Sequence, residues 1–236
     1  MAREKESTRY CWNPDEFRAM LEHCRMKPDL NWLGNILLTL GLTGMRISEL
    51  AQLCWSDVDL EDQQIRLVDE SRRGRRQAGR RQRTLQSKRG RSFPIHQELL
   101  PPLRQLPRHA DGYVFHGPRG GQIKPDTLRN ILIKELLTPL AEGFPAAAGE
   151  PGFTSGRLHS FRHFFWSLSA NSGVPERVVM DWLGHADAAM VRRYYHLNAE
   201  ESRRQMDRVS IQGVNADPQV IGGDVVAEEA PDRESA

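Results

Sequence analysis

The sequence predicts an α+β domain that is mostly α-helical and carries a small antiparallel β-sheet on one edge. Apolar residues recur at helical spacing in several segments that are bounded by capping residues, glycines or prolines. Strand-like alternation is confined to residues 55–69, around a turn at residues 61–63, and to residues 92–95, which resemble a returning strand. No internal repeat is visible, so we expect one helical domain with a single small sheet.

The first two helices have well-marked beginnings. Asn13 can cap a helix whose first position is Pro14, and Glu16 three residues later completes a capping box. A second helix is expected from near Asp29 to Leu40. Because that helix is apolar on most sides, we expect it to be buried.

A glycine turn follows at residues 41–44, and Arg46 lies at the start of the next helix. An arginine between Met45 and Ile47 is expected to be partly buried, and it then needs an anionic partner. Glu49 can supply that partner within the chain, because it lies at helical i,i+3 spacing. A bound anion is the other candidate, and this segment alone leaves both open.

The later helices and loops are predicted mainly from the residues that start or interrupt helices. Helices are expected over residues 97–104 and 126–140, followed by a loop over residues 141–156 that is rich in Ala, Gly and Pro. A helical run after residue 159 stops at residues 171–173, and another helix begins at Pro175 and ends at Gly184. Two more helices are expected over residues 187–194 and 200–209.

A strongly basic segment separates the two strand-like stretches. It has no acidic residue and contains nine arginines: Arg72, Arg73, Arg75, Arg76, Arg80, Arg81, Arg83, Arg89 and Arg91. Such a block is typical either of a flexible solvated segment or of a surface that binds a polyanion such as nucleic acid. Lys88 lies within it and is the only lysine between Lys27 and Lys124. Lysine gives up a proton more readily than arginine, so Lys88 is either a proton donor or a solvated loop residue.

The C-terminal segment 214–236 has the opposite charge. Six acidic residues against one arginine give it a net charge of −5, so the remainder of the chain carries +7. We expect this tail to be disordered and residues 1–213 to form the folded domain. No apolar run has the length of a membrane span and the N-terminus lacks a signal-peptide core, so a cytoplasmic location is expected. Cys11, Cys24 and Cys54 have no metal-like spacing and are expected to be reduced.

Residues 157–196 concentrate the groups that can carry chemistry. Arginines there can bind an oxyanion, histidines can move protons and a tyrosine can act as a nucleophile. His159 and Arg162 are three residues apart at a helix start, so both side chains can face one point. A zinc site is disfavoured because no H-E-x-x-H pattern is present, and a Ser-His-Asp hydrolase because no G-x-S-x-G elbow is present. No metal and no cofactor is expected.

Four motifs in this order resemble those of the tyrosine recombinase, or phage integrase, family, over residues 10–210. They are Thr43-Gly44-Met45-Arg46-Ile47-Ser48-Glu49-Leu50 (the first-arginine box), His159-Ser160-Phe161-Arg162-His163 (H-x-x-R), Leu183-Gly184-His185 (L-G-H) and Tyr194-Tyr195-His196 (the nucleophile segment). Each is a weak signal alone, but four in order around a basic hairpin are specific. The resemblance implies the catalytic-domain fold of that family and a site-specific recombinase or integrase that cuts and rejoins DNA through a 3′-phosphotyrosine intermediate.

The resemblance also implies the catalytic roles. Arg46 and Arg162 would clamp the non-bridging oxygens of the attacked phosphate, and His185 would add a further donor. His159 would be the general base that takes the tyrosine proton, and Lys88 the general acid that protonates the leaving oxygen. The reaction would need no ATP, because the energy of the phosphodiester is kept in the protein–DNA bond.

Two of these roles depend on spacing. Adjacent helical residues point about 100° apart, so only one of Tyr194 and Tyr195 can face the phosphate. The family spacing from His185 selects Tyr194 as the nucleophile and leaves Tyr195 as a packing or DNA-contacting aromatic. In the family, the lysine usually lies at a fixed interval before the returning strand, and counting back by that interval here reaches Gln86. The hairpin is therefore expected to be shorter in this chain. Lys88 is expected to be the acid because no other lysine is near.

The expected partners are double-stranded DNA and further copies of the chain, as a monomer in solution and a homotetramer on paired DNA sites. Family members usually carry a separate N-terminal DNA-binding domain, whereas only residues 1–12 precede the first predicted helix. The chain is then a catalytic domain alone, a fragment, or a protein that works with accessory DNA-binding proteins. Two other functions remain open, a type IB topoisomerase and a DNA-binding regulator of the same fold that does not cleave.

Overall fold

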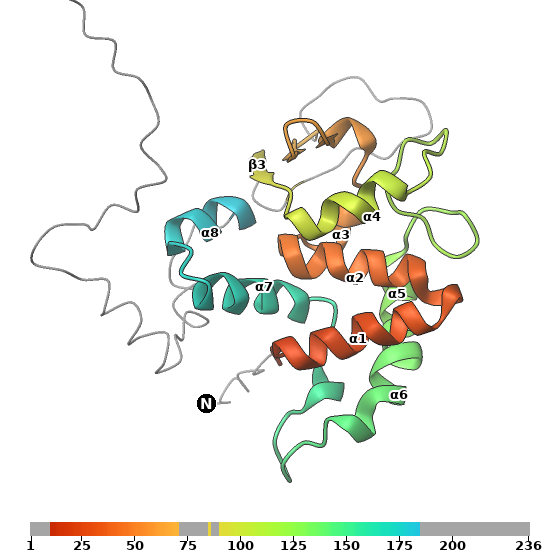
Figure 1. Cartoon of the computed structure of the whole chain (residues 1–236), viewed down its shortest axis with the longest axis vertical. Helices are drawn as coiled ribbons and strands as arrows, with labels where there is room; N and C mark the ends of the chain where they lie inside the picture. Colours follow the sequence, from red (N-terminus) through yellow and green to blue (C-terminus); the bar gives the residue numbers. More distant parts are fainter. Residues whose placement is uncertain (1–9, 71–84, 86–89, 185–236) are drawn as a thin grey trace, which may run out of the picture. The chain divides into compact units, whose positions relative to one another are not determined.

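A computed structural model describes residues 10–70, 85 and 90–184, and most of these residues are helical (Figure 1). The α-helices are α1 (Pro14–Met26), α2 (Asn31–Thr43), α3 (Ile47–Leu50), α4 (Leu100–Gln105), α5 (Pro125–Leu132), α6 (Thr138–Leu140), α7 (Ser160–Asn171) and α8 (Glu176–Leu183). Short 3₁₀ turns are η1 (Pro28–Leu30), η2 (Trp55–Asp57), η3 (Gln97–Leu99), η5 (Ala141–Gly143) and η6 (Phe153–Ser155), and η4 (Ile133–Leu137) is π-helical. The helices expected over residues 187–194 and 200–209, and the acidic segment 214–236, lie outside the described residues.

The predicted antiparallel sheet is confirmed and has the order β1 (Val58–Asp59), β2 (Gln64–Leu67), β3 (Arg91–Pro94). Val58 pairs with Ile65, and Ile65 pairs in turn with Phe93. Ile65 and Phe93 are buried, so one face of the sheet packs into the main core. The basic segment therefore connects two neighbouring strands, which places Arg91 at the first position of β3.

Helices α1, α2 and α7 pack together around an aromatic cluster. The capping box that starts α1 is present, because Asn13 accepts a hydrogen bond from the Glu16 amide and the Glu16 carboxylate accepts one from the Asn13 amide. Phe17 of α1 lies 4.5 Å from Phe164 of α7, ring centre to ring centre. A Cβ at Gly41 of α2 would lie 2.4 Å from the Phe17 ring, so the glycine lets that ring seat directly on the helix. As predicted, most of α2 is buried.

The helix predicted over residues 126–140 is present but contains a π-helical turn. Its segments α5, η4 and α6 follow one another without a break. Pro139 has no amide hydrogen to give to the carbonyl four residues before it, in η4, and a wider turn accommodates that missing bond. The predicted loop over residues 141–156 is mostly irregular, yet it is anchored by the buried Phe153, whose carbonyl accepts a hydrogen bond from the Trp12 indole. None of the described helices has the length and apolar character needed to cross a membrane.

Candidate active site

Arg46 is held at the start of α3 by the turn that precedes it and by Glu49. Gly44 ends α2 in the left-handed conformation, with φ at +58°. The Glu49 carboxylate accepts a hydrogen bond from the Arg46 amide at 2.9 Å and from its guanidinium at 3.3 Å. The Arg46 side chain remains 20% exposed, whereas Glu49 is 3% exposed. The pairing of Arg46 with Glu49 that the sequence left open is therefore present, and it leaves part of the guanidinium accessible.

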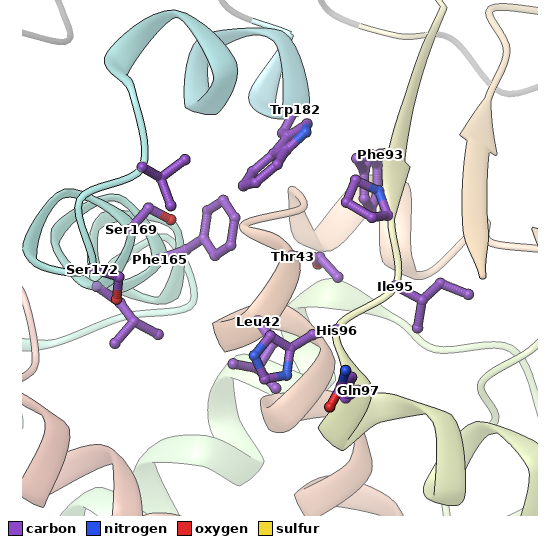
Figure 2. A pocket seen from close by; sticks show the side chains of 13 residues that line it. Leu42, Thr43, Phe93, Ile95, His96, Gln97, Phe165, Ser169, Ser172 and Trp182 are labelled. Atoms are coloured by element: carbon purple, nitrogen blue, oxygen red, sulfur yellow. The ribbon is translucent and has the colours of Figure 1, made fainter. Parts of the chain in front are cut away.

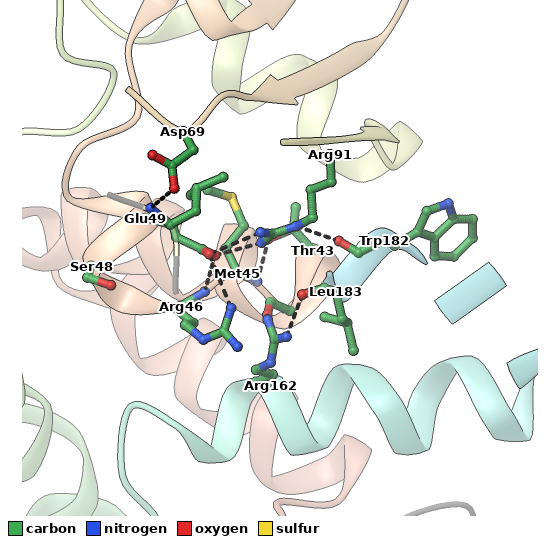
Figure 3. A network of polar contacts seen from close by, with 12 residues as sticks. Thr43, Met45, Arg46, Ser48, Glu49, Asp69, Arg91, Arg162, Trp182 and Leu183 are labelled. Carbon is green, nitrogen blue, oxygen red and sulfur yellow. Dashed lines mark hydrogen bonds and ion pairs between the residues drawn. The ribbon is translucent and has the colours of Figure 1, made fainter. Parts of the chain in front are cut away.

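Arg162 enters the same region from α7. Its side chain is buried, and its two terminal nitrogens donate hydrogen bonds of 2.6 Å to the carbonyl oxygens of Gly44 and Leu183. These carbonyls belong to the C-terminal ends of α2 and α8, where the last carbonyls of a helix lack partners within the helix. Arg162 thus joins three helices at one point (Figure 3).

Arg91 completes this network from β3, and its place differs from the expected one. The sequence grouped it with the arginines of the basic segment as a DNA contact, but its side chain is only 5% exposed. It donates two hydrogen bonds to the Glu49 carboxylate, at 3.0 and 2.6 Å, and a third to the carbonyl oxygen of Trp182 at 2.8 Å. The other arginines of the segment, Arg72 to Arg83 and Arg89, lie outside the described residues.

The network carries more positive than negative charge. Burial and, to a lesser degree, the neighbouring charges of Arg46 and Arg91 lower the pKa of Arg162 to about 9, while Glu49 acts in the opposite direction. Arg162 is still protonated at neutral pH, so in the described part of the chain three arginines surround the carboxylate of Glu49. Like charges held this close favour the binding of an anion between them.

His159 lies at the N-terminal end of α7 and is exposed. Its ring contacts that of His163, one turn further along, with 4.7 Å between the ring centres in an edge-on arrangement. His163 itself is buried. Arg162 and His159 therefore sit on the first turn of one helix as expected, with the arginine inside the network and the histidine at the surface. Lys88, His185, Tyr194 and Tyr195 lie outside the described residues.

A largely apolar pocket of about 410 Å³ lies beside the network (Figure 2). Thr43 and Trp182, which line it, directly precede Gly44 and Leu183, whose carbonyls hold Arg162. The Phe165 and Trp182 rings, whose centres are 6.3 Å apart, both line this pocket. The pocket therefore lies next to the ends of α2 and α8 whose carbonyls hold Arg162.

The ion pairs of Glu49 are expected to make the stability of the fold sensitive to acid. Burial raises the pKa of Glu49, but the hydrogen bonds and charges of Arg91 and Arg46 outweigh it and hold the pKa below its ordinary value of 4.5. The ionised Glu49 carboxylate therefore contributes its full stabilisation of the folded protein above pH 4.5. This contribution is lost as the pH falls through the pKa that Glu49 has in the folded protein, because the unfolded chain takes up the proton first. Urea unfolding measured from pH 7 downward should show this loss, and Glu49→Gln, expected to cost about 3–5 kcal/mol at pH 7, should flatten the dependence. An equally steep loss in Glu49→Gln would assign the acid sensitivity to other carboxylates.

Replacing Gly44 with alanine should destabilise the protein more than the same change at another left-handed glycine. A Cβ at Gly44 would lie 2.5 Å from Leu183 and 2.6 Å from Phe165, in addition to the cost of a positive φ. Gly120 has φ at +75° but no atom within 4 Å of such a Cβ, so Gly120→Ala measures the backbone cost alone. In guanidinium unfolding we expect Gly44→Ala to cost about 1–3 kcal/mol beyond that control. Equal losses in the two variants would show that the Leu183 and Phe165 side chains move aside at little cost.

The Phage integrase family matches residues 12–201, which is most of the chain. The chain belongs to this family. Among curated relatives, the tyrosine recombinase XerC of Xanthomonas axonopodis pv. citri (strain 306) is 28% identical over 169 residues, which cover 70% of this chain and 47% of XerC. The chain spans about half the length of the curated relatives that it matches.

Solved structures of integrases have the same fold. The Tn1549 transposon integrase in complex with transposon right end DNA matches with a TM-score of 0.66 and 19% identity, over 88% of this chain and 68% of that one. A lambda integrase tetramer bound to a Holliday junction matches with a TM-score of 0.59 and 17% identity, over 83% of this chain and 50% of that one. The predicted fold class, a mostly helical domain with a small antiparallel sheet, is confirmed.

Proposed function

We propose that this chain is the catalytic domain of a site-specific recombinase that cuts and rejoins DNA through a 3′-phosphotyrosine intermediate. The observation that carries the proposal is the pair of guanidinium groups of Arg46 and Arg162, which the fold brings together from α7 and from the segment before α3. In a member of the phage integrase family, two arginines beside one another at the positions of its arginine motifs fit a DNA phosphate.

The chemistry follows from the charges that develop at the phosphate. The Tyr194 oxygen attacks the phosphorus while His159 takes the phenolic proton, so a phosphorus–oxygen bond forms to the tyrosine. The bond to the 5′-oxygen breaks, and Lys88 gives that oxygen a proton. Arg46, Arg162 and His185 stabilise the negative charge on the non-bridging oxygens. Rejoining is the reverse reaction, with a 5′-hydroxyl as the nucleophile.

Arg46 and Arg162 differ in how they would reach the phosphate. Arg46 keeps part of its guanidinium exposed, so it can present donors directly to a phosphate oxygen. Two nitrogens of Arg162 donate hydrogen bonds to backbone carbonyls, which hold the guanidinium in place. Its remaining donor groups and its charge therefore act from a fixed position. A site that is organised before DNA binds needs little rearrangement during the reaction.

The remaining partners of this proposal are double-stranded DNA and other copies of the chain. We expect the arginines of residues 72–89 to contact DNA phosphates, and a monomer in solution to assemble as a tetramer on two paired sites. The lambda integrase tetramer on a Holliday junction supports this arrangement as the assembly of a structurally similar protein. The expected location is the bacterial cytoplasm, where the chromosome and mobile elements lie.

The test is a covalent trap with the full chain. Duplexes carrying the inverted repeats that flank its gene, each with a nick beside the cleavage position, lose a short 5′-hydroxyl fragment after attack and cannot be rejoined. We expect an adduct that resists denaturation and joins the protein to a 3′-phosphate. DNA binding without any adduct would instead indicate a regulator, and relaxation of supercoiled plasmid lacking the repeats would indicate a topoisomerase.

A further inference from the structure

Arg91 is the one arginine of this network that has no proposed contact with the reacting groups, and its side chain is buried. It lies at the first position of β3, with its side chain 5% exposed. Among the described residues, its side chain contacts the two carboxylate oxygens of Glu49, the carbonyl of Trp182 and, at 5.8 Å, the ring of Phe93. Each of the three guanidinium nitrogens of Arg91 therefore already donates to an oxygen atom of the protein.

The contacts of Arg91 determine what Glu49 can offer Arg46. Arg91 forms the two-pronged pair with the carboxylate, at 3.0 and 2.6 Å, which is the stronger geometry for an arginine and a carboxylate. The Arg46 guanidinium is left with one longer contact of 3.3 Å. Glu49 is thus fixed by Arg91 and orients Arg46 without neutralising it, which keeps the exposed part of Arg46 available for an anion.

The third hydrogen bond of Arg91 fixes the end of α8. Arg91 holds the carbonyl of Trp182, and Arg162 holds that of Leu183, the next residue. Gly184 then turns the chain with φ at +67°, and a Cβ there would lie 3.1 Å from the Arg91 side chain. The glycine of the L-G-H motif therefore lies against Arg91, directly before His185.

We propose that Arg91 is a positioning residue for DNA cleavage. It sets the orientation of Arg46 through Glu49, and it sets the end of α8 from which the chain continues to His185. This role rests on the proposed function, because it concerns the phosphate that Arg46 would bind. It separates Arg91 from the other arginines of residues 72–91, which are expected to act by contacting DNA.

The experiment compares Arg91→Gln and Arg91→Lys with Arg83→Gln in the full chain. For each protein, the affinity for the nicked duplex and its salt dependence are measured by fluorescence anisotropy. The rate of adduct formation is measured in a single turnover with protein in excess, at a temperature where near-ultraviolet circular dichroism shows every variant folded. Affinity and rate per bound complex are thereby obtained separately.

For Arg91→Gln we expect the rate per bound complex to fall about 100-fold, the scale for a reacting group misplaced by about 1 Å, with affinity and salt slope unchanged. Arg91→Lys keeps the charge but lacks the planar fork that reaches two oxygens and a carbonyl at once, so it should recover only part of the rate. Arg83→Gln should show the reverse pattern, with weaker binding, a salt slope reduced by about 1 and an unchanged rate at saturation.

Three results would overturn this role for Arg91. Weaker binding and a smaller salt slope in Arg91→Gln, with the rate retained, would make Arg91 a DNA contact. A lower denaturation midpoint with both rate and affinity unchanged would make it a structural ion pair only, and full activity of Arg91→Lys would make the charge sufficient without the fork. A wild-type chain that forms no adduct defeats the proposed function itself, which is a different outcome from a defect confined to the variants.

Discussion

Tyr194→Phe should form no covalent adduct with the nicked duplex and should still bind it. Phenylalanine keeps the ring and removes only the hydroxyl oxygen, which is the atom that would attack the phosphorus. Removing the nucleophile of other enzymes lowers turnover on the order of 10⁶-fold, so the trapped product should fall below detection. The measurement is the yield of protein–DNA adduct on a denaturing gel, with anisotropy on the same samples to show that binding is retained.

Tyr195→Phe is the matched control, because the two tyrosines are neighbours and the change is identical. We expect it to form the adduct at a rate close to that of the wild-type chain. An adduct from Tyr194→Phe together with its loss in Tyr195→Phe would transfer the role of nucleophile to Tyr195. Loss in both variants, with binding retained, would mean that the neighbouring hydroxyl also takes part.

Arg46→Ala should reduce the rate of adduct formation by about 10²–10³-fold, the effect of removing one donor from a site that stabilises developing negative charge. Arg46→Lys should also be slow, because an ammonium group cannot give two parallel hydrogen bonds to a phosphate. The fold should survive both changes, since the Arg46 side chain makes a single ion pair at 3.3 Å and its backbone bond to Glu49 does not depend on the side chain. Single-turnover rates and urea unfolding measure the two effects.

Arg18→Ala provides the comparison for Arg46→Ala. Arg18 also forms an i,i+3 pair with a carboxylate, that of Asp15, but both side chains are well exposed. Such a pair contributes less than about 1 kcal/mol, and no role in cleavage is expected for it. An Arg46→Ala protein that cleaves at the rate of Arg18→Ala would remove Arg46 from the phosphate site.

Features that depend on neighbouring residues were predictable from the sequence. The start of α1 was predicted because its capping box needs only Asn13, Pro14 and Glu16, and the structure has each of its hydrogen bonds. The pairing of Arg46 with Glu49 was foreseen as one of two alternatives for the same reason, since the two are one helical turn apart. The order of the motifs along the chain also led to the right family.

Features that depend on distant residues were not predictable. Arg91 and Glu49 are separated by 42 positions, and no local pattern connects them. Among nine arginines of one block, composition cannot distinguish the one that turns inward; the only local signal was the alternation of apolar Phe93 and Ile95, which marked the start of a strand. The partners of Arg162 are backbone carbonyls of Gly44 and Leu183, and every residue has such a group, so the sequence could not select them.

The contact between Arg91 and Gly184 has a consequence for engineering chimeric proteins. Positions 49, 91 and 184 come from three separate segments, yet they form one matched set, because the arginine pairs with the carboxylate and its side chain lies close against the glycine. A hairpin taken from a relative without an arginine at position 91 would leave Glu49 buried with a weaker partner. In chimeras that exchange the basic segment 72–91, positions 49, 91 and 184 should therefore all come from the same parent.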